Sequence, residues 1–171
     1  MVKKSFCVLP KYQNMQSELE IVLDALRNER NLTLVSSSNS KRVDLIHEAF
    51  SFLREQEKDA ITYYINIANT QTLDELSKIF AEIVVGKDCV SLNQIFLHLS
   101  VLEKRVYIAI DNFQQILKYP EKGIDTLLRS CVEESTNVTF IFAGNNEHEM
   151  HKMFVSPTKP FYQSTQFLKM L

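Results

Sequence analysis

The polar stretch Ser36–Val43 (SSSNSKRV) carries hydroxyl groups, a lysine and an arginine, all of which can bind anions. It follows the β-rich run Asn31–Ser36 and precedes a helical pattern over roughly residues 42–57. Serine-rich turns at helix N-termini bind phosphate or sulfate, because free backbone N–H groups and the helix dipole favour negative charge. The alternative is a plain polar turn in which Lys41 and Arg42 are both solvated, as surface cations usually are. We favour the plain turn and keep anion binding as the second interpretation.

Two more polar positions follow apolar runs. Asp111 and Asn112 come at the end of Val106–Asp111 (VYIAID), and Asn145 follows Val138–Gly144 (VTFIFAG). A carboxylate can hold a divalent cation, or it can cap backbone N–H groups at the strand end, and both interpretations of Asp111 stay open. Asn112 can hydrogen-bond a water molecule but cannot act as a base. Asn145 could contact a ligand, although an ordinary turn is the more typical use of asparagine.

Alternating strands and helices would position these groups. Helical spacing predicts helices over 14–29 and 42–57, capping boxes predict further helices after Thr72 and Ser91, and later helices are expected around Ile124–Cys131 and Glu147–Phe154. The expected strands are Asn31–Ser36, Ile61–Ile67, Val106–Asp111, Val138–Gly144 and Ser164–Leu171. This alternation predicts an α/β fold with a parallel sheet and helices on both faces. We expect residues 1–171 to form one domain, since no repeat or linker interrupts the pattern.

The composition excludes several classes of function. The chain has 171 residues, a net charge of -2 and a pI of about 6.1, so no general affinity for nucleic acid or anionic membrane is expected. No apolar run approaches the ~20 residues that span a bilayer. The three cysteines are widely spaced, which indicates reduced thiols and a cytoplasmic protein. Three glycines are few for this length, and a phosphate-cradling loop depends on glycine.

Two smaller features favour structural roles. His148 and His151 could lie on one helix face, but without a third ligand nearby they do not predict a metal site. The aromatic cluster Phe154, Phe161 and Tyr162, with Pro160, indicates packing, or a face where a lid or a partner would sit.

Four strings together resemble a known group. They are VYIAIDNFQQILKY (Val106–Tyr119), NVTFIFAG (Asn137–Gly144), MHKMF (Met150–Phe154) and PFYQST (Pro160–Thr165). The order of elements and these strings resemble the AAA-type ATPases of the archaeal and Bacteroides kind, in the STAND branch of P-loop NTPases. The resemblance implies a three-layer α/β/α fold with a five-stranded parallel sheet in the order 5-1-4-3-2. It also implies Mg-ATP at the carboxyl end of the first strand and a helical lid domain, which we expect this chain to lack.

The resemblance assigns roles that this sequence does not fill. In the phosphate loop G-x-x-x-x-G-K-[ST], Ser36 and Lys41 stand at the glycines, Arg42 at the lysine and Val43 at the magnesium-binding hydroxyl. A shift of one residue places Lys41 at the lysine but Ser40 at the second glycine, so neither register restores the site.

At the other positions that the family uses, one acid is kept and two are replaced. Asp111 is kept where the family holds Mg²⁺, and Asn112 replaces the glutamate that activates water. Asn145 stands at the position of the polar sensor, and Asn66 replaces an aspartate.

Three functions follow as hypotheses. The first is an ATPase-like domain that has lost hydrolysis and acts as an interaction or regulatory module with a protein partner and no cofactor. The second is a divergent ATP-binding protein or weak ATPase, with Mg-ATP or ADP bound through Lys41 or Arg42 and Asp111. The third, a DNA-associated module, is disfavoured by the acidic charge balance. No specific nucleic acid or membrane partner is expected, and the sequence gives no oligomeric state.

Overall fold

The computed structural model describes residues 10–86 and 91–171, with side chains from residue 16 onward. Five parallel strands form one sheet in the order β2-β3-β4-β1-β5. The strands are β1 (Leu32–Val35), β2 (Ile61–Asn66), β3 (Val106–Asp111), β4 (Val138–Gly144) and β5 (Gln166–Lys169). This order is the expected 5-1-4-3-2 read from the other edge, so the fold class and the strand order are confirmed.

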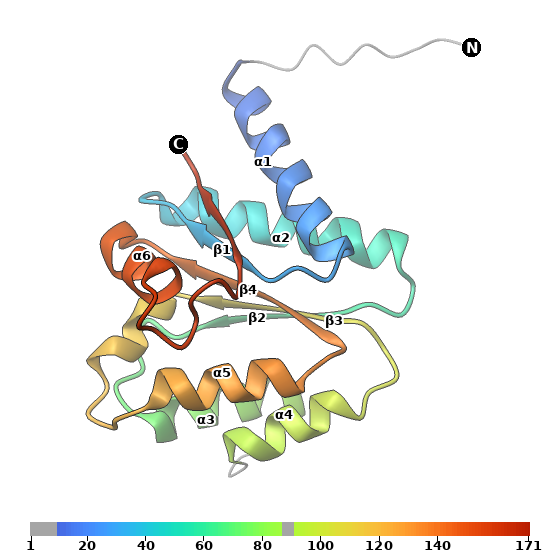
Figure 1. Ribbon diagram of the computed structural model, residues 1–171. Coiled ribbons are helices and arrows are strands. Elements are labelled where there is room, and N and C mark those ends of the chain that lie inside the picture. The colour runs from blue at the N-terminus through green and yellow to red at the C-terminus, as the bar shows by residue number, and fades with distance from the viewer. Residues whose placement is uncertain (1–9, 87–90) are drawn as a thin grey trace.

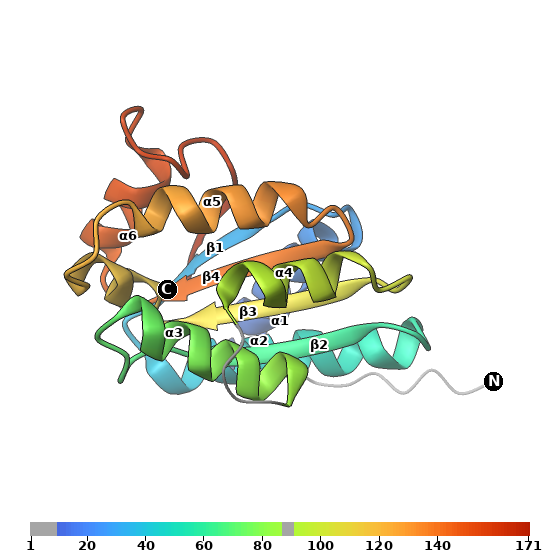
Figure 2. The ribbon, with the colours of Figure 1, turned by 90° about the horizontal axis from the view of Figure 1, so that it is seen from below.

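Helices cover both faces of the sheet (Figure 1). Helices α1 (Pro10–Arg27) and α2 (Asn39–Gln56) lie on one face. The other face carries α3 (Leu73–Phe80), which continues into a π-helical turn η1 (Ala81–Val85), α4 (Leu92–Ser100) and α5 (Ile124–Glu134). Figure 2 shows these helices from below the sheet. A 3₁₀ helix η2 (Phe113–Lys118) and α6 (Glu147–Val155) lie at the end of the sheet where the strands finish.

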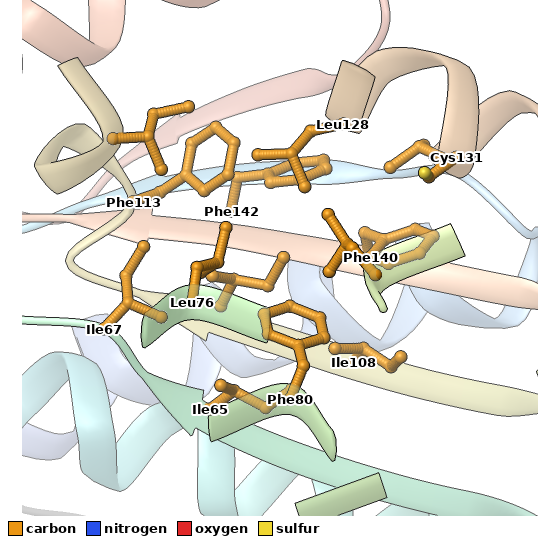
Figure 3. Packing of buried hydrophobic residues seen from close by; sticks show 14 of the residues in the cluster. Ile65, Ile67, Leu76, Phe80, Ile108, Phe113, Leu128, Cys131, Phe140 and Phe142 are labelled. Atoms are coloured by element: carbon orange, nitrogen blue, oxygen red, sulfur yellow. The ribbon is translucent and has the colours of Figure 1, made fainter. Parts of the chain in front are cut away.

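The alternation of side chains along β3 separates two hydrophobic cores. Val106, Ile108 and Ile110 point to the α3–α5 side, whereas Tyr107 and Ala109 point to the α1–α2 side. Figure 3 shows the larger core, in which Phe140 and Phe142 of β4 pack against α3 and α5. By the same period of two, Asp111 belongs to the α2 side of the sheet, which decides its partners.

The ends of the elements agree with the local signals in most cases. The Thr72 hydroxyl accepts a hydrogen bond from the Glu75 N–H, and Ser91 forms a full capping box with Gln94. The expected helix 42–57 is wrong at its start, because α2 begins at Asn39 with Ser38 as its N-cap. No sequence pattern predicts η2 or the π-helical form of η1, although the helix expected after Thr72 does continue through η1. Cys7 and Cys89 lie outside the described residues, and Cys131 is a buried free thiol.

A hydrogen-bonded pair fixes the opposite end of the sheet. The Tyr107 hydroxyl donates to both carboxylate oxygens of Glu57, at 2.9 and 3.1 Å, and Arg105 forms an ion pair with the same carboxylate. Burial, and then the bond to Glu57, raise the pKa of Tyr107 to about 12 from an ordinary value of 10.0.

Within residues 10–86 and 91–171, no helix is both long and apolar enough to cross a membrane.

Tyr107 gives a pH-dependence that can be measured. Because its pKa is higher in the folded chain, the unfolded chain loses this proton first as the pH rises above 10. The folded chain therefore loses stability between about pH 10 and 12, and Tyr107→Phe should reduce the slope of that loss. Urea unfolding at pH 9 and at pH 11.5 measures the slope in both proteins. Equal slopes would contradict the assignment.

Candidate functional site

The carboxyl ends of β1, β3 and β4 gather the polar positions singled out in the sequence. Val35 is in register with Gly144, and Asn66 is in register with Asp111. The Ser36 N–H donates to the Gly144 carbonyl oxygen at 3.1 Å, which continues the pairing of β1 and β4 past the strand ends. In a parallel α/β sheet, ligands bind outside the carboxyl ends of the strands. This edge is therefore the candidate site.

The stretch expected to form a phosphate loop is mostly helix. Residues 36–38 connect β1 to α2, while residues 39–43 already belong to the first turns of α2. In residues 36–43, all of which the structure describes, no backbone φ is positive. An anion-binding nest needs consecutive N–H groups that point outward, usually from alternating right- and left-handed residues. That geometry is missing from this connection.

Several backbone N–H groups of the connection already have acceptors within the chain. The Ser38 N–H donates to Ser36 Oγ at 3.2 Å, and the Lys41 N–H donates to Ser38 Oγ at 3.4 Å. The Arg42 N–H donates to the Ser38 carbonyl oxygen at 3.2 Å. These bonds are those of an ordinary N-capped helix start. Ser40 and Lys41 are exposed and Val43 is half-buried.

Arg42 lies inside the protein, and the prediction that it is solvated is wrong. Its guanidinium is 1% exposed and donates from Nε to Asp111 Oδ1 at 2.7 Å. Nη1 donates to the Ser36 carbonyl oxygen at 2.9 Å, and Nη2 donates to Asn39 Oδ1 at 3.0 Å. The burial follows from the early start of α2, because Arg42 then lies on the helix face that packs on the sheet.

Both carboxylate oxygens of Asp111 are occupied by protein donors. Oδ1 accepts from Arg42 Nε and from the Asn112 N–H at 2.9 Å, and Oδ2 accepts from the Tyr64 hydroxyl at 2.6 Å. The carboxylate is 1% exposed. Burial, and then the bond to Asp111, raise the pKa of Tyr64, so this hydroxyl stays a donor at neutral pH. Asp111 thus does cap a local N–H group, but its main partner is a buried cation.

Asn112 and Asn66 join the ends of β3 and β2. Asn112 adopts a left-handed conformation (φ 59°), which asparagine tolerates better than most residues. Its side-chain Nδ2 donates to Asn66 Oδ1 at 3.0 Å, and the same oxygen accepts from the Ala68 N–H at 3.0 Å. Asn112 therefore links the carboxyl ends of β2 and β3, at the position where the resemblance implies a water-activating glutamate.

Asn145 is exposed at the end of β4, as a turn residue would be. Its Oδ1 accepts from Gln114 Nε2 at 2.6 Å. With Asn146, Glu147, His148 and His151 it lines an open hollow of about 760 Å³. Among the residues that the structure describes, no group of three or more His, Cys, Asp or Glu side chains could hold a metal ion.

Sequence reasoning missed three partners of these residues: Tyr64, Asn39 and Gln114. Tyr64 could have been found, because it precedes Asn66 by two positions and so shares the face of β2 toward Asp111. Asn39 lies before the helix that the spacing predicts, so the sequence assigns it to a loop. Gln114 lies in η2, which no sequence pattern indicated.

Mg-ATP, which the resemblance implies, does not fit the residues at this edge. The carboxylate that would hold the magnesium ion is buried, and both of its oxygens accept hydrogen bonds, from Arg42, Tyr64 and the Asn112 N–H. The connection that would cradle the phosphates is a capped helix start. No step of ATP hydrolysis can be assigned to these residues.

Comparison with solved structures agrees with the fold. The chain is similar to the ORC1 protein of Aeropyrum pernix in complex with DNA (TM-score 0.70, 17% identity, 96% of this chain and 46% of that one). It is similar to the ORC2 protein of the same organism in ADPNP-ADP complexes (TM-score 0.66, 14% identity, 95% and 48%). It is also similar to a Walker-type ATPase of Pyrococcus abyssi (TM-score 0.67, 17% identity, 91% and 52%).

These likenesses concern the fold, because the identities are low and a fold does not determine a function. The chain spans about half the length of these three proteins. No protein-family model matches the sequence, and no curated protein matches it. The chain thus has the three-layer, P-loop ATPase-like fold of these ORC and Walker-type ATPase structures.

Proposed function

We propose that this chain is a P-loop ATPase-like domain of degenerate STAND type that has lost hydrolysis and acts as an interaction or regulatory module. One observation carries the proposal: both oxygens of Asp111 are bound by protein donors inside the domain. Magnesium is bound through carboxylate oxygens and retained waters. A cation would have to displace Arg42 and Tyr64 before it reached this carboxylate.

The rest of the edge supports the same proposal. Phosphoryl transfer depends almost wholly on positioning and on stabilising charge, which a cradle, a lysine and a metal ion supply. Here the cradle positions are helical, the residue in the lysine position points into the protein, and Asn112 replaces the glutamate. These changes remove, in turn, the phosphate cradle, the lysine that would bind phosphate and the base that would activate water.

We predict no calorimetric heat of binding when millimolar Mg-ATP or Mg-ADP is titrated into the wild-type chain. We also expect phosphate release no faster than from a Lys41→Ala variant, because Asp111 has no free oxygen to hold the metal. Malachite-green detection of phosphate measures the turnover. Turnover clearly above the Lys41→Ala variant would overturn the proposal.

The alternative function is a divergent ATP-binding protein or weak ATPase. Lys41 favours it, because this exposed cation lies in the first turn of α2, next to the helix N-terminus. This alternative predicts a rise in melting temperature with Mg-ATP that Lys41→Ala abolishes. Lys41 is the suitable position for the test, because its side chain is not part of the buried ion pair.

The proposed partner is a protein. Structures with this fold include the ORC1 protein bound to DNA and an ORC assembly of Drosophila bound to DNA and Cdc6. A DNA-associated function for this chain is less favoured, because its net charge is -2. If the chain bound duplex DNA at physiological salt, the DNA-associated function would again be a candidate.

A further inference from the structure

We infer that Arg42 is a built-in cation that takes the place of a bound metal–nucleotide, so that the carboxyl edge of the sheet is held in one state without any ligand. The inference rests on the proposed function and deepens it, because it says how the domain keeps its shape once nucleotide is lost. The same carboxylate that would hold a metal ion holds this guanidinium at 2.7 Å.

The contacts of Arg42 join the elements that a nucleotide would join. Nε binds Asp111 at the end of β3, and Nη1 binds the carbonyl oxygen of Ser36 at the end of β1. Nη2 binds Asn39 within the first turn of α2. One planar group thus ties two strands to the helix that follows the loop. Guanidinium suits this role because its donors form a fixed fork.

Further hydrogen bonds join β2 to the elements that Arg42 holds together. The Tyr64 hydroxyl binds the other oxygen of Asp111, and the Asn112 side chain binds Asn66. The ring of His47, on α2, lies 4.8 Å from the ring of Tyr64. The ends of β1, β2 and β3 and the start of α2 therefore form one bonded unit around Asp111.

The charges in this unit are balanced without a ligand. Arg42 and Asp111 are each 1% exposed and carry opposite charges. A divalent cation at Asp111 would lie beside the guanidinium in a medium of low dielectric constant, where like charges repel strongly. The guanidinium and a metal ion thus exclude one another, and the guanidinium is covalently part of the chain.

Chemical rescue tests this inference. Arg42→Ala leaves a space beside Asp111 that is large enough for methylguanidinium, which carries the same planar charged group as arginine. The melting temperature of Arg42→Ala should fall by about 6–20 °C, and tens of millimolar methylguanidinium should recover several degrees of that loss. Lys41→Ala, the matched control at the neighbouring exposed cation, should melt close to the wild type with no recovery. Tetramethylammonium at equal concentration controls for salt.

Two further measurements complete the test, and the second does not require Arg42→Ala to fold. Methylguanidinium should not rescue Arg42→Ala/Asp111→Ala, because the acceptor is then missing. In the wild type, the amide hydrogens of residues 41–43 and 65–67 should exchange at the same rate with and without Mg-ATP. Arg42→Ala as stable as Lys41→Ala, or exchange at these amides slowed by Mg-ATP, would overturn the inference.

The two proposals fail in different ways. Wild-type turnover of ATP would defeat the proposed function whatever Arg42 contributes to stability. A silent wild type whose Arg42→Ala variant melts normally would defeat this inference and leave the loss of hydrolysis intact.

Discussion

Replacing Asp111 with alanine is expected to lower the free energy of unfolding by about 3–5 kcal/mol, because a buried ion pair that loses one partner leaves an uncompensated charge. Arg42 would keep its positive charge at 1% exposure, and the Tyr64 hydroxyl and the Asn112 N–H would lose their acceptor. Urea unfolding followed by circular dichroism measures the change. In an open nucleotide site the same substitution would chiefly weaken Mg-ATP binding, so stability separates the two roles of this aspartate.

Asp59→Ala is the matched control. Asp59 also has a cationic neighbour, since its carboxylate lies 3.9 Å from Lys104 Nζ, but it is 85% exposed. Exposed pairs contribute about 0–1 kcal/mol, so this variant should unfold close to the wild type. Similar losses in Asp111→Ala and Asp59→Ala would mean that the pair of Arg42 and Asp111 does not stabilise the fold.

The α/β class was predictable because its signals are local. Apolar runs such as Val106–Ile110 and Val138–Ala143 are typical of strands covered on both faces, and both are buried throughout. Local sequence patterns do not predict the order of the strands, because the order depends on which segments pair across the sheet. It came from the resemblance, and the register of Val35 with Gly144 agrees with it.

The burial of Arg42 was missed because its partner is distant in sequence. By itself, an arginine beside a lysine indicates a surface cation, whereas the acid that neutralises Arg42 lies 69 positions later. Two signals were nevertheless present. Arg42 precedes Leu45 and Ile46 by three and four positions, which places it on the buried face of a helix. Asp111 follows Ala109 by two positions, which turns it toward that helix.

A loss of stability as large as that from breaking the ion pair is expected from Phe161→Ala. Four phenylalanines from η2, β4, α6 and the segment before β5 contact one another in every pairing, with ring centroids 4.7–5.7 Å apart, and they are Phe113, Phe142, Phe154 and Phe161. Phe161 is 1% exposed. Truncating a buried phenylalanine costs about 3–5 kcal/mol, because apolar contact is lost and a cavity remains. Urea unfolding measures the difference from the wild type.

The neighbouring residue provides the control and distinguishes packing from a docking role. Tyr162 is 37% exposed, and Tyr162→Ala should cost about 1 kcal/mol or less. Phe113 and Phe142, which lie close together in Figure 3, follow Asn112 directly and precede Gly144 by two residues, respectively. The cluster therefore supports the edge that holds Asp111. Phe161→Ala should therefore also speed amide exchange at residues 111–115. A variant that unfolds like Tyr162→Ala would mean that the segment before β5 is dispensable for the core and that its aromatic residues serve another purpose.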